Sequence, residues 1–248
     1  MAIFIPGFHA AMQSIPAGPT AVIEVWVGEG KKGKRISAIL NLARRFGVRV
    51  EEKTKAELDE LLPGVSHQGI VVVARDFQYA DLEVALAGAE KSEKDPVFVV
   101  VDHITDEGNL ASILRTSAFF GAAGIIIPKD RSARVSPQVL KRAVGCHLYL
   151  SISRVVNLAR TLDFLDSRGY WIVGTGAEAR KTIYEYQWSG PIALVVGNEE
   201  RGLSKEVRKR CHEIVAIPSP SGVDSLNVGV ATGIVLAELT RARSSGAR

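Results

Sequence analysis

Runs of apolar residues alternate with amphipathic and polar stretches along the whole chain, and the pattern changes near residue 96. Before that point, strands are predicted at residues 21–27, 48–51 and 69–74 and helices at residues 35–46 and 55–62. Gly47 after the first helix, Thr54 before the second and Pro63-Gly64 after it are typical helix end signals. Residues 1–76 are therefore predicted to form a small α/β domain.

From residue 96 the alternation of strands and helices becomes regular. Strands are predicted at residues 97–101, 124–127, 148–152, 170–174, 192–196 and 213–217. Several of these runs are apolar throughout, as expected for strands covered on both faces, so residues 96–248 are predicted to form an α/β domain with a mostly parallel sheet. Residues 77–95 are richer in Ala, Glu and Lys, include one short helix at 81–90, and are taken as a linker.

The last helix is expected to begin at Ser225, because serine is a good N-cap residue. The helix contains the small residues Gly229, Ala231, Gly233 and Ala237, which permit another backbone to approach closely.

The composition is that of a globular protein, with 248 residues, 46% hydrophobic and 23% charged. Cys146 and Cys211 lack a further thiol or histidine at metal-ligand spacing, so neither a disulfide framework nor a metal site is expected. No segment reaches the roughly 18 apolar residues of a membrane span. These features favour a reducing, cytoplasmic location.

The net charge of +4 and the pI near 9.1 permit a polyanionic partner without requiring one. Seven cations lie between residues 28 and 49, against the single acid Glu29. Without other evidence, a solvated helix face with a basic loop is the favoured explanation of this cluster. RNA binding becomes the favoured explanation once other features point to RNA. The candidate RNA-binding residues are Lys31, Lys32, Arg35, Arg44 and Arg45.

Residues 171–179 match a strand followed by G-x-G-x-x-A, the fingerprint of dinucleotide-binding turns. The fingerprint usually opens the first βαβ unit of its domain, whereas here several strands precede it. Three interpretations stay open: a nicotinamide or flavin site, a plain turn, or small residues that let the backbone approach a different nucleoside-bearing cofactor.

Three polar stretches follow predicted strands, at residues 109–116, 197–203 and 225–228. Each has an ordinary structural explanation as a helix cap or turn. The second stretch follows strand 192–196 directly, at the carboxyl end where open α/β sheets bind ligands. Asn109 and Arg115 are six residues apart and point about 120° apart around a helix. They cannot form one tight pair, but they could flank one substrate.

In this order, the three stretches resemble the SpoU (TrmH, SPOUT) family of RNA ribose 2′-O-methyltransferases. The family patterns N-L-G-x-I-x-R-T-A, G-x-E-x-x-G-L and a Pro-containing loop ending S-L-N-V-S are met at residues 109–117, 197–203 and 218–229. His67-Gln68-Gly69-Ile70 and Gly7-Phe8-His9-Ala10 are similar to the substrate-binding domain of ribosomal RNA members. The departures are Ala111, Ser117, Ser221 and Gly229, where the family usually has Gly, Ala, Met and Ser. The likeness is greatest to bacterial 23S rRNA guanosine 2′-O-methyltransferases.

The resemblance implies an S-adenosylmethionine-dependent methyltransferase domain with helices on both faces of the sheet and a C-terminal trefoil knot. It also implies a small L7Ae/L30e-like domain for binding the RNA substrate, a homodimer, and no metal. The implied cofactor-binding residues are Thr175, Gly176, Ala177, Gly197, Asn198, Ile217, Pro218 and Leu226. Among them, Gly197, Ile217 and Leu226 would offer backbone contacts to the adenosine.

The family links Arg115 to activation of the ribose 2′-hydroxyl. Because a guanidinium stays protonated, we expect Arg115 to act through charge and hydrogen bonding and not as a general base. The other implied catalytic residues, which would orient the ribose and the loops, are Asn109, Glu199, Ser225 and Asn227.

Three alternatives stay open: a catalytically silent RNA-binding ribosome-assembly factor on the same fold, a 2′-O-methyltransferase of transfer RNA, and a nucleotide-dependent oxidoreductase. A silent factor would be expected to have lost Asn109, Arg115 or Glu199, and none is lost. The shared motifs concern the cofactor and the ribose, so the target base stays undetermined.

Overall fold

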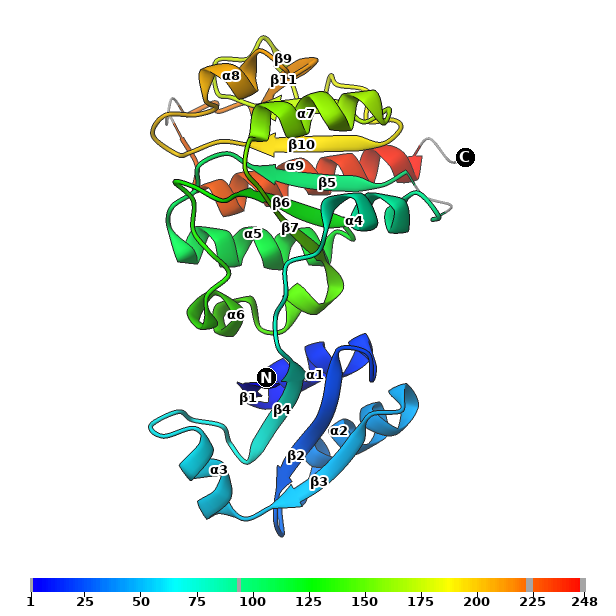
Figure 1. Cartoon of the computed structure of the whole chain (residues 1–248), viewed down its shortest axis with the longest axis vertical. Coiled ribbons are helices and arrows are strands. Elements are labelled where there is room, and N and C mark those ends of the chain that lie inside the picture. Colours follow the sequence, from blue (N-terminus) through cyan, green and yellow to red (C-terminus); the bar gives the residue numbers. More distant parts are fainter. Residues whose placement is uncertain (1, 93–94, 222–224, 246–248) are drawn as a thin grey trace. The chain divides into compact units, whose positions relative to one another are not determined.

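A computed structural model describes residues 2–92, 95–221 and 225–245 of the chain (Figure 1). The chain forms two compact units, Met1–Gln78 with Ala143–Tyr149, and Tyr79–Arg142 with Leu150–Arg248. The first unit therefore includes a short segment from the second half of the sequence, which the sequence pattern did not predict. The division also differs from the expected linker at residues 77–95, because α4 (Leu82–Ala89) belongs to the second unit.

The first unit contains a four-stranded sheet. Its strands, in spatial order, are β1 (Ala2–Pro6), β4 (Ile70–Arg75), β2 (Val22–Gly28) and β3 (Arg49–Lys53). β4 is antiparallel to β1 and β2, and β2 is parallel to β3. The helices are α1 (Phe8–Ser14), η1 (Ile15–Ala17), α2 (Lys34–Phe46) and α3 (Lys55–Leu61). The strands expected at 21–27, 48–51 and 69–74 are thus confirmed, whereas β1 was not predicted.

Apolar side chains of α1 and α2 cover one face of this sheet. Ala11 of α1 and Ile39 of α2 are fully buried in a cluster with alternating residues of β2 and β4, such as Val25 and Val72. This alternation is the pattern of strands that bury one face on helices.

The predicted helix ends of the first unit are confirmed. Gly47 ends α2 in the left-handed conformation (φ 67°), which glycine adopts without steric cost. Thr54 and Glu57 form a capping box at the start of α3: the Glu57 N–H donates to Thr54 Oγ1 (3.2 Å), and the Thr54 N–H donates to Glu57 Oε2 (2.7 Å).

The second unit contains a seven-stranded sheet in which all neighbouring strands are parallel. Its strands, in spatial order, are β7 (Ser151–Val155), β6 (Gly124–Pro128), β5 (Val97–Val101), β10 (Ile192–Val196), β8 (Trp171–Thr175), β11 (Glu213–Ala216) and β9 (Lys181–Thr182). The α/β class and the mostly parallel sheet are confirmed. The strand expected at 148–152 begins later, because Cys146–Tyr149 form the 3-10 helix η2.

Helices cover both faces of this sheet. They are α4, α5 (Glu107–Phe119), α6 (Pro137–Ala143), α7 (Leu158–Ser167), α8 (Lys205–Arg208) and α9 (Val228–Ser245). All residues of β5, β6 and β10 are buried. α4 and α7 pack on one face, where Leu86 and Leu162 join Phe98 in one core, and Figure 1 shows α9 behind the strands.

The small residues of α9 allow it to pack closely on α5. A Cβ added at Gly229 would lie 2.3 Å from Ser112 Oγ, and one at Gly233 would lie 3.2 Å from Thr116 Cγ2. The expected close approach is confirmed at these two positions. No helix within the described ranges is long and apolar enough to cross a membrane.

The expected N-cap at Ser225 is wrong. α9 begins at Val228, and Asn227 Oδ1 accepts hydrogen bonds from the N–H groups of Gly229 (3.0 Å) and Val230 (3.3 Å). Asparagine caps helices as well as serine does, and here it stands closer to the first helical turn. Positions 222–224, which stand between the expected cofactor-binding residues Pro218 and Leu226, lie outside the described residues.

Candidate active site

The carboxyl ends of four neighbouring strands meet at one edge of the second sheet. Val101 of β5 is level with Val196 of β10, and Val215 of β11 is level with Thr175 of β8. The arrowheads of β5 and β10 mark this carboxyl edge in Figure 1. Loops that are far apart in sequence therefore leave the sheet at the same place, where α/β proteins bind their ligands.

A buried carboxylate, Asp102, holds two of these loops together. It is 1% exposed, and its Oδ2 accepts a hydrogen bond from the N–H of Ser204 (2.6 Å). Its other oxygen pairs with the ring of His103, and its own N–H donates to Val196 O (2.9 Å). A buried charge requires such partners. Sequence analysis did not single out Asp102, although an acid directly after an apolar strand was a usable signal.

The loop after β10 is a tight turn that requires its glycines. A Cβ at Gly197 would lie 2.5 Å from the carbonyl carbon of Gly202, and Gly202 has a φ of 63°. Asn198 and Gly202 exchange backbone hydrogen bonds of 3.1 and 2.8 Å. The spacing of the G-x-x-x-x-G-L motif thus has a steric cause.

Asn198, an expected cofactor-binding residue, uses its side chain to hold this turn. Its Oδ1 accepts hydrogen bonds from the N–H groups of Glu200 (3.0 Å) and Arg201 (3.2 Å). Its Nδ2 donates to the carbonyl of His103 (3.3 Å), so the amide also ties the β10 loop to the β5 loop.

Three of the expected catalytic residues, one from each polar stretch, are joined by hydrogen bonds through Asn227. Asn227 Nδ2 donates to Asn109 Oδ1 (2.7 Å) and to Glu199 Oε1 (2.9 Å). Glu199 Oε1 also accepts from the N–H of Val228 (2.9 Å), at the start of α9, where a negative charge is favourable. Asn109 itself is placed by Asp106, which caps α5 by accepting from the Asn109 N–H (2.7 Å).

The other two expected catalytic residues, Arg115 and Ser225, are exposed and stand apart from this set. Within the described part of the chain, neither side chain has a hydrogen bond or an ion pair. Arg115 lies on α5, about one and two-thirds turns beyond Asn109. Its guanidinium is a cation available to a substrate.

The expected cofactor-binding residues follow the neighbouring strands β8, β10 and β11. Thr175 ends β8, and its Oγ1 donates a hydrogen bond to the carbonyl of Val195 (3.3 Å). The Gly176 N–H donates to Val215 O (3.1 Å). Ala177 is exposed at the following turn. After β11, Ile217 is half-buried, and Pro218 and Leu226 are exposed.

The dinucleotide interpretation of residues 171–179 is wrong. Its fingerprint requires a helix directly after the strand, whereas here a turn and the short strand β9 follow β8. Gly174 serves packing, since a Cβ there would lie 2.7 Å from Leu203 Cδ1 and 2.9 Å from Cys211 Sγ. Burial raises the pKa of Cys211 to about 11, so this thiol is not a nucleophile at neutral pH.

The expected RNA-binding cations all lie exposed in the first unit. Arg35 lies over the ring of Phe8 and Arg45 over that of Phe46, each with its guanidinium carbon 5.5 Å from the ring centroid. Arg44 and Arg45 stand in the last turn of α2, where cations are favourable, so part of this cluster has a structural role. Lys31 and Lys32 follow β2 in the loop before α2.

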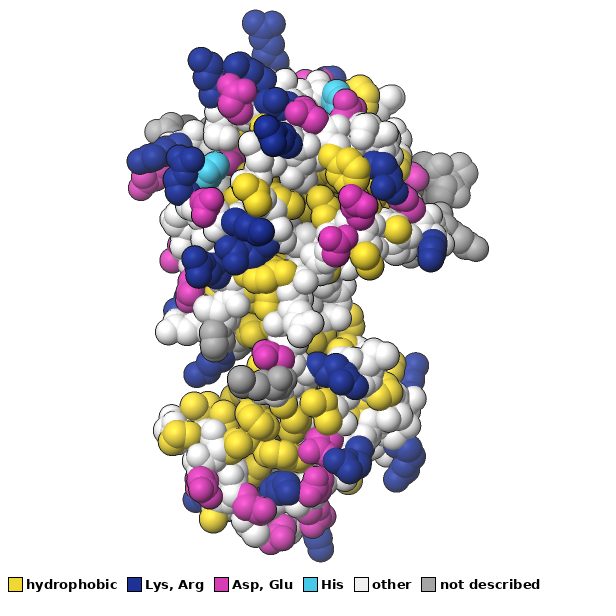
Figure 2. Space-filling model, in the orientation of Figure 1, with side chains coloured by type: hydrophobic (Ala, Val, Ile, Leu, Met, Phe, Trp, Pro, Cys, Tyr) yellow, Lys and Arg dark blue, Asp and Glu magenta, His cyan; other side chains and the backbone are white. Residues whose placement is uncertain are grey.

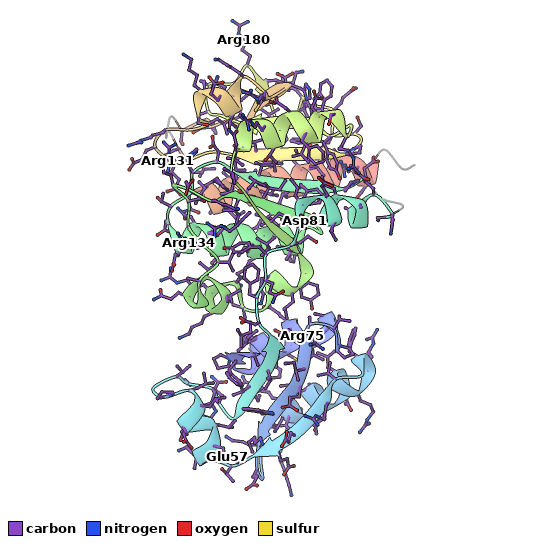
Figure 3. The ribbon with its side chains drawn as sticks, viewed as in Figure 1. Glu57, Arg75, Asp81, Arg131, Arg134 and Arg180 are labelled. Atoms are coloured by element: carbon purple, nitrogen blue, oxygen red, sulfur yellow. The ribbon has the colours of Figure 1, made fainter. Side chains whose placement is uncertain are left out.

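Sequence analysis missed a second group of cations, at the carboxyl edge. Arg131 and Arg134 are exposed in the loop after β6 and project from this edge in Figure 3. The loop is tied to the β5 loop by hydrogen bonds from Ala133 N–H (2.7 Å) and Ser132 Oγ (3.1 Å) to Ile104 O. Figure 2 shows Lys and Arg side chains gathered along the same side of the unit.

A parallel sheet with interlocked polar loops at its carboxyl edge defines a ligand-binding α/β protein of the open-sheet class. Family models assign the chain more narrowly. Residues 96–237 match the SpoU rRNA Methylase family, and residues 4–80 match the RNA 2'-O ribose methyltransferase substrate binding domain. The chain belongs to the SpoU rRNA methylase family, which confirms the resemblance seen in the motifs.

Curated relatives match almost the full chain. The 23S rRNA (guanosine-2'-O-)-methyltransferase RlmB of Vibrio parahaemolyticus is 39% identical over 243 residues, covering 97% of both chains. The putative TrmH family tRNA/rRNA methyltransferase YacO of Bacillus subtilis is 32% identical, covering 97% of this chain and 96% of its own. Among solved structures, the SpoU methyltransferase AviRb from Streptomyces viridochromogenes is 25% identical, with a TM-score of 0.74, covering 99% of this chain and 91% of its own.

Proposed function

We propose that the protein transfers a methyl group from S-adenosylmethionine to a ribose 2′-hydroxyl, that of a guanosine in 23S rRNA. The observation that carries the proposal is the hydrogen-bonded set of Asn109, Glu199 and Asn227, which joins three family motifs at the carboxyl edge. Relatives at 37–39% identity over nearly the full chain are named for this reaction.

The residues at the ends of β8, β10 and β11 fit the adenosine part of this cofactor. Thr175, Gly176 and Ala177 form a turn of small uncharged residues, and Ile217, Pro218 and Leu226 add apolar surface. Leu226 is 46% exposed, which suits an apolar side chain that covers a bound group. When bound, the cofactor supplies an activated methyl group with its leaving group already in place.

The side chains of this unit would position and activate the ribose. Asn109, Glu199 and Asn227 are fixed by their mutual hydrogen bonds, so they can orient the ribose in line with the methyl donor. Arg115 stays protonated and would donate hydrogen bonds to the 2′-oxygen as negative charge develops there. The hydroxyl proton then passes to another acceptor, for which a phosphate oxygen of the RNA is suited. Ser225 would contact the ribose from the loop before α9.

The proposal includes the C-terminal trefoil knot and the homodimer that the family resemblance implies. β10 lies between β5 and β8 although it follows both in sequence, and α9 returns to pack on α5, which supports a threaded C-terminal part. Phe119 on α5 is 82% exposed and Val230 on α9 is 51% exposed. Apolar side chains exposed on this helix pair support burial against a second copy.

The proposal also assigns RNA binding to the first unit and a cytoplasmic location to the protein. The match of residues 4–80 to a substrate-binding domain and the exposed cations Lys31, Lys32, Arg35, Arg44 and Arg45 support the first assignment. The cytoplasmic location is supported by the two cysteines, whose positions in the sequence do not indicate a disulfide.

The test is transfer of labelled methyl from S-adenosylmethionine to unmodified 23S rRNA, with ribose methylation mapped in the product. Transfer RNA serves as the parallel substrate, because one relative is named for both RNAs. We expect label at one 2′-oxygen of a guanosine in 23S rRNA. Label only on transfer RNA would contradict the substrate, and no label on either would contradict the enzyme class.

A further inference from the structure

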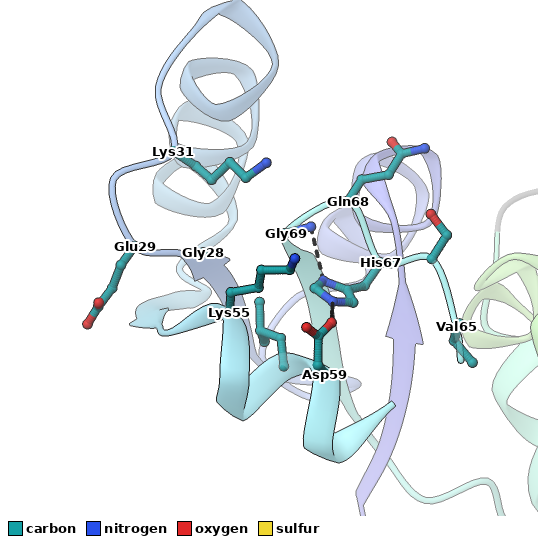
Figure 4. Close-up of a pocket in the computed structure, with 11 residues that line it drawn as sticks. Gly28, Glu29, Lys31, Lys55, Asp59, Val65, His67, Gln68 and Gly69 are labelled. Atoms are coloured by element: carbon teal, nitrogen blue, oxygen red, sulfur yellow. Dashed lines mark hydrogen bonds and ion pairs between the residues drawn. The ribbon is translucent and has the colours of Figure 1, made fainter. Parts of the chain in front are cut away.

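A pocket of about 320 Å³ opens in the first unit, and Lys31 is its only lining residue to which the proposed function assigns a role (Figure 4). It lies between the loop after β2 and the turn at residues 67–69. Lys31, Lys55 and Gln68 contribute long polar side chains, Val65 contributes apolar surface, and the fully buried Leu58 lies beneath the floor. Its volume is at the lower end of the range for small-molecule sites, about 300 to 1,000 Å³.

The turn that forms one wall is held by a buried histidine. His67 is 7% exposed; its Nδ1 accepts a hydrogen bond from the N–H of Gly69 (3.0 Å), and its Nε2 lies 2.9 Å from Asp59 Oδ1. Because Nδ1 is an acceptor, the ring proton is on Nε2 and is donated to Asp59. Both ring nitrogens are therefore used to fix the turn, and His67 is a positioning residue.

The backbone of this turn is strained at the residue that reaches the rim of the pocket. Gln68 has a φ of 54°, which glutamine rarely adopts, and Gly69 has a φ of 77°. A Cβ at Gly69 would lie 2.9 Å from Lys31 Cε, so the Lys31 stem packs directly on Gly69. Strained residues held by their surroundings are typical of ligand-binding sites.

The charges that face the pocket favour an anion. Within the described residues, the ammonium groups of Lys31 and Lys55 have neither a hydrogen bond nor an ion pair. Asp59 is engaged by His67, and Figure 4 shows the Glu29 carboxylate pointing away from the pocket. Two unpaired ammonium groups at one opening attract a phosphate.

We propose that this pocket binds one unpaired nucleotide of the RNA substrate. Its phosphate lies between Lys31 and Lys55, its base packs on the half-buried Val65, and the Gln68 amide hydrogen-bonds the edge of the base. The pocket has room for one nucleotide and not for a duplex, and RNA-binding proteins commonly read bases that are splayed out of single-stranded loops. This inference rests on the proposed function, because it takes the RNA to be the methylation substrate.

The first test removes the two charges in the full-length protein. Lys31→Ala and Lys55→Ala are each expected to weaken binding of unmodified 23S rRNA about 3- to 10-fold and to lower the slope of log K against log salt by about 1. The KM for RNA should rise while kcat is unchanged. Lys91→Ala, which removes an exposed lysine from the second unit, is the matched control and should stay within about 2-fold.

A pair of Gln68 variants distinguishes a direct contact of Gln68 with RNA from a purely structural role in the turn. Gln68→Gly relieves the backbone strain and removes the amide, whereas Gln68→Asn keeps an amide on a residue that tolerates positive φ. The proposal predicts about 5- to 10-fold weaker RNA binding for Gln68→Gly and a smaller loss for Gln68→Asn. Wild-type RNA affinity in Gln68→Gly would overturn the assigned contact.

Methylation by the wild-type protein is measured in the same experiments. Failure of the pocket proposal can then be distinguished from failure of the proposed function. If the wild type methylates 23S rRNA and the Lys31→Ala/Lys55→Ala variant keeps its KM and salt slope, the pocket is overturned and the function stands. If the wild type methylates no RNA but the same variant binds 23S rRNA more weakly with a reduced slope, the pocket is supported and the function is overturned. Unchanged thermal unfolding of the variants ensures that a loss of binding is not a loss of fold.

Discussion

The carboxyl edge of the second unit and the pocket of the first unit use polar side chains in opposite ways. At the edge, Asn109, Glu199 and Asn227 hydrogen-bond one another and are fixed before a substrate arrives. At the pocket, Lys31 and Lys55 have no partner within the described residues. Reaction geometry requires fixed groups, while a long polyanion is held by cations that can adjust to it. The two sites should therefore respond differently to substitution.

Arg115, like Ser225, is an expected catalytic residue that departs from this rule, because it is exposed and unpaired in the described chain. Arg115→Ala should lower kcat for methyl transfer by about 10³-fold, the scale of losing one group that stabilises developing charge. Its stability should change by no more than about 0.5 kcal/mol. Single-turnover transfer, cofactor titration and thermal unfolding measure these effects, with Arg115→Lys as the variant that keeps the charge. Full activity in Arg115→Ala would remove the assigned role.

Gly197→Ala tests whether the edge is as rigid as its contacts imply. The added methyl would lie 2.5 Å from the backbone at Gly202, so the turn must open, at a cost of about 1 to 3 kcal/mol. Cofactor affinity should fall as well, because the turn is part of the proposed site. Denaturant unfolding and cofactor titration are the measurements.

Gly88→Ala is the matched control for Gly197→Ala. A Cβ at Gly88 of α4 meets nothing within 4 Å, so this variant should be more stable by about 0.5 to 1 kcal/mol, because alanine favours a helix. If both variants unfold as the wild type does, the turn at Gly197 is not tightly closed.

Most of the fold could be predicted from the sequence, because apolar periodicity and end signals are local. Gly47 and Thr54 end and begin their helices as predicted, and the apolar runs at β5 and β10 are buried strands. β1 pairs with β4, and residues 143–149 join the first unit, only through contacts distant in sequence. The order of strands in the sheet is likewise a non-local property.

The candidate site was predictable only in part, for a similar reason. The motifs contained Asn109, Glu199 and Asn227, but their hydrogen bonds exist only once β5 and β10 are neighbours. Asp102 was missed although it directly follows an apolar strand. The motif at His67 was noticed, but the pocket beside it was not, because its walls come from segments that are distant in sequence. The misplaced N-cap at Ser225 shows the limit of local signals, since Asn227 is an equally good cap two residues later.

The two units also differ in the hydrogen bonding of a buried titratable side chain. Asp102 has three hydrogen-bonding contacts in the second unit, through its side chain and its N–H. In the first unit, neither ring nitrogen of the buried His147 has a hydrogen-bond partner among the described residues, and the ring lies edge-on to Phe77. Burial lowers the pKa of His147 to about 4 from an ordinary value of 6.5.

Stability should therefore fall as the pH falls from about 6.5 toward 4, because the unfolded chain binds the proton that folded His147 resists. The full effect is up to about 3 kcal/mol and is absent above pH 7. Urea unfolding at pH 7.5, 6 and 5 measures it. His147→Leu should show a smaller decline over the same range, and an identical decline in both proteins would assign the pH dependence to other groups.

A further comparison within the edge concerns how α9 is held there. Asn227→Ala removes the cap of α9 and the hydrogen bonds to Asn109 and Glu199, so it should cost about 1 to 2 kcal/mol. Ser225→Ala removes a side chain with no hydrogen bond in the described structure and should stay within about 0.5 kcal/mol. Thermal unfolding of both variants gives the comparison. A larger loss at Ser225 than at Asn227 would restore Ser225 as the cap, and the fixed set at the edge would then depend on a different residue.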